Sequence, residues 1–133
     1  MNPAFVLVPG AFSNSFGWAP LQRELALRGL RSLTVDLPGR GYGARIPLAY
    51  QAPQDAAALA SAPSGLAGAS LAANVEHVVG LVRRGAAHGP VIADADELTP
   101  DNPFDVHSIE SSHAGFLVHP GQAADILAGL ATG

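Results

Sequence analysis

At 133 residues the chain is long enough for one domain, and its 48% hydrophobic and 14% charged residues exclude a disordered polypeptide. The net charge is -4 and the seven basic residues are all arginine, so we expect no nucleic-acid partner, which would require a basic stripe. The absence of cysteine excludes disulfides and thiolate metal sites, and no apolar run reaches the ~20 residues of a membrane helix. We therefore expect a cytoplasmic protein without membrane attachment.

The first third of the chain predicts a strand, a helix and a second strand. Residues 5–8 form an apolar run with β-branched members that stops at Pro9-Gly10, as a strand buried on both faces would. A helix is predicted from about Ala19 to Arg28, with Gly29 ending it. Its apolar positions are Trp18, Leu21 and Leu25. Residues 32–36 read as the second strand, which completes a βαβ unit with parallel strands.

The middle of the chain predicts a long loop followed by a helix. Glycine and proline recur through residues 39–69, within which an alanine-rich patch at residues 55–60 is expected to form a short helix. Helical spacing returns from Ser70 to about Ala87, and Ser70 suits the N-cap. The apolar positions expected to share one face of this helix are Leu71, Val75, Val78, Val79 and Val82.

The last third predicts two further strands and a terminal helix. The strands are expected at residues 91–93 and 104–109, and Pro120 opens the helix. The alternation predicts one α/β domain with about four mostly parallel strands and helices on both faces, a shortened three-layer arrangement. The expected sheet order is 32–36, 5–8, 91–93 and 104–109. An exposed apolar sheet edge predicts self-association.

Three stretches of the chain resemble the α/β-hydrolase fold family. Residues 5–18 show an apolar strand, a Pro-Gly turn with a small residue, and a tryptophan; residues 36–41 are Asp-Leu-Pro-Gly-Arg-Gly. The family commonly has His where Pro9 stands. Residues 111–116, followed by Pro120 and a helix, resemble the segment with the family's histidine. The resemblance implies hydrolysis of carboxylic esters or related acyl bonds by a Ser-His-acid mechanism.

The resemblance assigns roles to five residues. The backbone N–H of Ala11 corresponds to an oxyanion donor, and His113 corresponds to the general base. Phe12, Ser13 and Phe116 would line the site for a small apolar ester-like ligand. Two plainer interpretations stay open: Pro9-Gly10 as only a tight strand exit, and His113 as a surface or capping residue. No cofactor is implied, and no histidine spacing indicates a metal site.

The nucleophile of the family has no counterpart, because Gly-x-Ser-x-Gly does not occur in the chain. The sequence reads as though a central block were missing near residues 92–93. Ser70 follows a glycine at the right spacing, but it fits an N-cap better. Three hypotheses follow: a deleted hydrolase with an unknown nucleophile, an inactive remnant that binds a small ligand or a protein, and a protein whose missing block is supplied by another chain.

Overall fold

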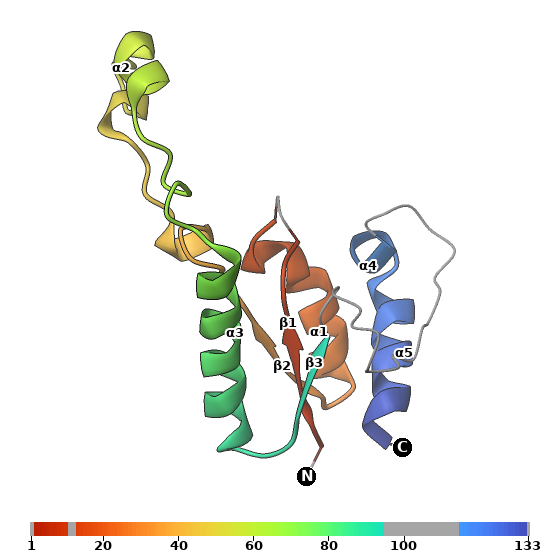
Figure 1. The fold of residues 1–133 in the computed structure, drawn as a ribbon. Coiled ribbons are helices and arrows are strands. Elements are labelled where there is room, and N and C mark those ends of the chain that lie inside the picture. Colours follow the sequence, from red (N-terminus) through yellow and green to blue (C-terminus); the bar gives the residue numbers. More distant parts are fainter. Residues whose placement is uncertain (1, 11–12, 95–114, 133) are drawn as a thin grey trace.

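A three-stranded parallel sheet is the centre of the computed structural model, which describes residues 2–10, 13–94 and 115–132 (Figure 1). Strand β1 (Ala4–Leu7) lies between β2 (Arg31–Thr34) and β3 (Val91–Asp94). Ala4 pairs with Arg31 on one side and with Val91 on the other. The predicted order of the first three strands is confirmed. The described residues form three strands instead of about four, and the predicted strand at 104–109 lies outside them.

The side chains of β1 alternate between two hydrophobic cores, as the two-residue period of a strand requires. Phe5 and Leu7 point into a core formed with α1 (Ala19–Leu27) and α5 (Pro120–Thr132). Val6 points to the opposite face, into a core formed with α3 (Leu71–Ala86). All four residues of β1 are buried, which explains why this segment is an uninterrupted apolar run.

Helices α1 and α5 cover one face of the sheet together (Figure 1). The Arg28 side chain joins them, because its guanidinium contacts the Glu24 carboxylate at 2.9 Å and the Asp125 carboxylate at 2.8 Å. Two short helices flank this pair: the 3-10 helix η1 (Ser15–Trp18) and α4 (Gly115–Val118).

Helix α3 covers the other face and begins as predicted, since the Ser70 side chain accepts a hydrogen bond from the Ala73 N–H. The predicted apolar face is wrong in part. Val78 and Val82 pack on the sheet, but three of the expected core positions are exposed on a different side of the helix: Leu71, Val75 and Val79. A helix of this length can therefore carry two apolar sides, of which the sheet covers one.

The segment between β2 and α3 leaves the body of the molecule as an arm, with α2 (Ala56–Ser61) at its far end (Figure 1). The 3-10 helices η2 (Gly41–Gly43) and η3 (Leu48–Tyr50) lie in the part of the arm that runs from β2 to α2. The predicted short helix within this loop is confirmed. Within the described ranges, no helix has both the length and the apolarity needed to cross a membrane.

Candidate functional site

The loops after β1 and β2 meet at the carboxyl edge of the sheet, where ligands of open α/β sheets bind. Asp36 holds them together. One of its carboxylate oxygens accepts a hydrogen bond of 2.8 Å from the Ser15 N–H, and the other accepts one of 3.1 Å from the Tyr42 N–H. The first of these bonds spans 21 residues of sequence, so it fixes the loop after β1 relative to the loop after β2.

Hydrogen bonding keeps Asp36 ionised. Partial burial raises the pKa of this carboxyl, but the hydrogen bonds from the backbone of Ser15, the backbone of Tyr42 and the Ser15 hydroxyl together outweigh burial. The net effect holds the pKa of Asp36 below its ordinary value. The junction between the two loops is therefore a fixed negative charge at neutral pH.

Three further contacts close the same junction. The Arg40 guanidinium donates to the Gly10 carbonyl oxygen at 3.3 Å, and the rings of Phe16 and Tyr42 lie 5.1 Å apart between centroids. Gly41 has a φ of 55°, and a Cβ at this position would collide with the Asp36 carboxylate. Glycine is needed here both for the backbone conformation and for the close approach of Asp36.

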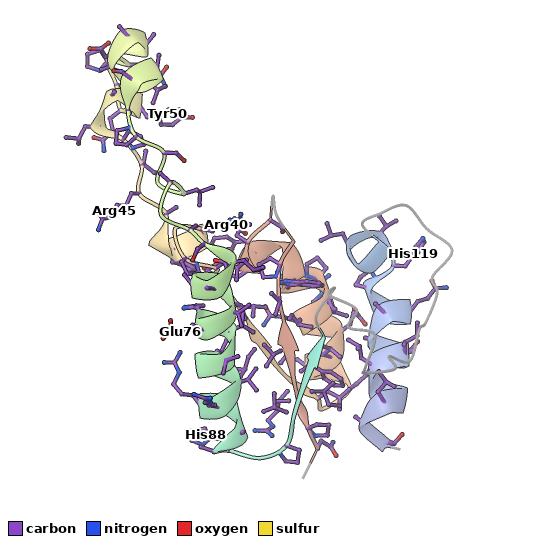
Figure 2. The ribbon with its side chains drawn as sticks, in the orientation of Figure 1. Arg40, Arg45, Tyr50, Glu76, His88 and His119 are labelled. Atoms are coloured by element: carbon purple, nitrogen blue, oxygen red, sulfur yellow. The ribbon has the colours of Figure 1, made fainter. Side chains whose placement is uncertain are left out.

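An open cleft of about 340 Å³ borders this junction on the β2 side. The residues that line it include Asp36, Arg40 and His77, together with the apolar Leu81 of α3. Figure 2 shows Arg40 near the place where the arm leaves the body. A larger groove of about 740 Å³ lies on α3 alone and touches neither loop, so it is not part of this site.

The predicted site residues fall mainly outside the described part of the chain. Ala11, Phe12 and His113 lie outside it, and so does the side chain of Phe116, although α4 includes its backbone. Ser13 is described: its N–H donates to the Gly10 carbonyl oxygen at 3.2 Å, closing a turn, and its hydroxyl donates to the Asn14 carbonyl oxygen at 3.4 Å. The oxyanion donor and the base therefore stay predictions.

Sequence reasoning missed the part that Asp36 plays in joining the loops. The signal was present, because an aspartate lies two residues after β2 and directly before Leu-Pro-Gly. The two loops that it joins could not be read from the sequence, since two of its hydrogen bonds come from backbone N–H groups, which nearly every residue has. The described residues contain no group of three or more potential metal ligands.

Comparison with known proteins adds no relative, because neither a family model nor a curated protein matches the chain.

Proposed function

We propose that the chain is a shortened α/β-hydrolase-like protein that binds a small apolar carboxylic ester at the carboxyl edge of its sheet and hydrolyses it slowly. The observation that supports the proposal is the junction at Asp36. It holds the loop after β1, which carries Ala11, against the loop after β2. The described residues on either side of Ala11 are held in place, Gly10 by Arg40 and Ser15 by Asp36. This supports the proposal because an oxyanion donor is effective only when its dipole is already fixed.

In the proposed reaction, His113 takes a proton from a water molecule while the water oxygen attacks the ester carbonyl carbon. The backbone N–H of Ala11 stabilises the negative charge that develops on the carbonyl oxygen. The bond to the leaving alcohol then breaks, and the alcohol oxygen receives the proton from His113. Phe12, Ser13 and Phe116 would contact the acyl group.

Water is the proposed nucleophile because the chain contains no Gly-x-Ser-x-Gly. Hydrolases that lose a member of their triad retain roughly 10³–10⁴-fold acceleration over water, from the oxyanion hole and substrate binding. We expect an activity above that order, because general-base catalysis by His113 adds to these two contributions, and no acyl-enzyme intermediate.

A second candidate is a module that binds the same class of ligand without hydrolysing it. A specific observation favours it: Ser70, which follows a glycine at the spacing of the family's nucleophile, caps α3 through its side chain. That serine is engaged in helix capping and does not stand on a strand-to-helix turn.

The two candidates are separated by turnover of a short-chain nitrophenyl ester and by labelling with a fluorophosphonate probe. The hydrolase proposal predicts slow turnover that falls by roughly 10²–10⁴-fold in His113→Ala, the contribution of a general base, and is kept in His119→Ala, a matched control because His119 is exposed at the start of α5. It also predicts no covalent label. Ligand-induced NMR shifts without turnover would support the binding module, and a labelled serine would refute water as the nucleophile.

A further inference from the structure

Helix α3 carries a second apolar surface that the fold does not use. This surface, the α3 flank, is lined by Leu71, Ala72, Val75, Glu76, Val79, Gly80 and Arg83. Leu71 is 65% exposed, Val75 50% and Val79 38%, whereas Val78 and Val82 of the same helix pack against the core. The three follow one another at intervals of four residues and so form one ridge along the helix.

A shallow groove runs beside this ridge, because Gly80 has no side chain there. A Cβ added at Gly80 would meet no atom within 4 Å, so the position is an open notch on the surface. A ridge next to a notch is the arrangement that lets two helices pack closely, with a side chain of one entering the gap in the other.

Two opposite charges border the ridge and the notch. Glu76 and Arg83 are seven residues apart, which is roughly 10.5 Å along a helix axis. Within the described part of the chain neither forms an ion pair, and neither has an oppositely charged residue three or four positions away on α3. Figure 2 shows Glu76 on the side of α3 turned away from the sheet.

We propose that the α3 flank binds the α3 flank of a second copy of this chain, in an antiparallel arrangement about a two-fold axis. The proposal goes beyond the ester chemistry and does not depend on it. If the axis passes between Val79 and Gly80, Glu76 of each copy faces Arg83 of the other, which gives two equivalent ion pairs. In the same register the Val79 side chains of the two copies meet beside the axis, and Gly80, which has no side chain, leaves room for the two helices to approach each other.

The positions of Glu76 and Arg83 favour a second copy of this chain as the partner and an antiparallel arrangement of the two helices. A parallel pair would place Glu76 beside Glu76 and Arg83 beside Arg83, where like charges repel. An isologous antiparallel pair satisfies both charges with one contact used twice. A pair of single helices is small beside the roughly 1,200–2,000 Å² of a stable interface, so we expect a reversible dimer with a micromolar Kd.

The test is sedimentation velocity of the full chain over a wide concentration range. The wild type should pass from one to two chains per particle as concentration rises. Val79→Asp should weaken the dimer by about tenfold or more, because it buries an unpaired carboxylate at the centre of the interface. Val118→Asp is the matched control, since Val118 is 59% exposed on α4, away from the flank, and should leave dimerisation unchanged.

Charge reversal makes the test specific. Glu76→Arg and Arg83→Glu should each be monomeric, because each places like charges opposite one another, and circular dichroism should report folded chains. A mixture of the two variants should dimerise, since both ion pairs are then attractive. A wild type that stays monomeric, a dimer that survives Val79→Asp, or a mixture that stays monomeric would overturn the proposal.

Discussion

The substitution Asp36→Asn removes one acceptor oxygen and one negative charge from the junction between the loops after β1 and β2. The carboxylate accepts from two backbone N–H groups, one at each oxygen. An asparagine keeps one acceptor, now uncharged, and turns an NH₂ group toward the other backbone donor. One hydrogen bond is therefore lost and the other is weakened.

A hydrogen bond to a charged group contributes about 1.5–3 kcal/mol, so we expect Asp36→Asn to lower the free energy of unfolding by about 2 kcal/mol at neutral pH. At about 2.1 cal/mol/K per residue, this corresponds to a Tm roughly 7 °C lower for a chain of this length. Asp55→Asn is the matched control. Asp55 caps α2 by accepting from the Ala58 N–H at 2.9 Å, and asparagine caps as well as aspartate.

The pH dependence tests the charge itself. Because the pKa of Asp36 is lower in the folded chain than its ordinary 3.8, ionisation stabilises the fold fully above that value. The contribution is lost as the pH falls through the folded pKa. The difference in Tm between wild type and Asp36→Asn, measured by differential scanning calorimetry, should be constant above about pH 5 and shrink below about pH 4. Equal Tm values at pH 7, or a difference that persists undiminished in acid, would refute the reasoning.

Three other substitutions test the packing. Gly41→Ala should destabilise the chain by about 1–2 kcal/mol or more in urea unfolding, because it forces a side chain into a positive φ beside Asp36, whereas Gly43→Ala should be nearly neutral. Leu25→Ala, at a fully buried position of α1, should cost about 2–5 kcal/mol by the same measurement, and similar losses at Leu27→Ala, which is 75% exposed, would contradict this account of the core. Arg28→Gln should lower the Tm slightly at low salt and not at high salt, because its ion pairs are at the surface.

Local signals made most of the helices predictable. The helix expected from about Ala19 to Arg28 is observed as Ala19–Leu27, and Gly29 follows with a φ of 70°. Pro120 opens α5, and Ser70 caps α3. These signals are available from sequence because a cap or a breaker acts on neighbouring backbone groups. The strand order of β2, β1 and β3 was also predictable, since right-handed crossovers leave few alternatives for a short βαβ chain.

The α3 helix marks where this reasoning ends. Helical spacing places Val75, Val78 and Val79 within one broad arc, but it does not say which part of the arc touches the sheet. That depends on how the helix is rotated about its own axis over the sheet. In the structure Val78 packs against the core and Val75 is exposed to solvent. The exposed α3 flank could therefore be identified only from the structure.

By itself the sequence determined that this is an α/β chain and where most of the described helices begin and end. Those properties depend on neighbouring residues and on apolar spacing. Only the tertiary structure decided that Asp36 ties two loops together and that one side of α3 is left uncovered. Both depend on contacts between segments far apart in the chain, whose partners are backbone groups or whole surfaces instead of recognisable residues. Ala11 and His113 stay predictions, because they lie outside the described residues.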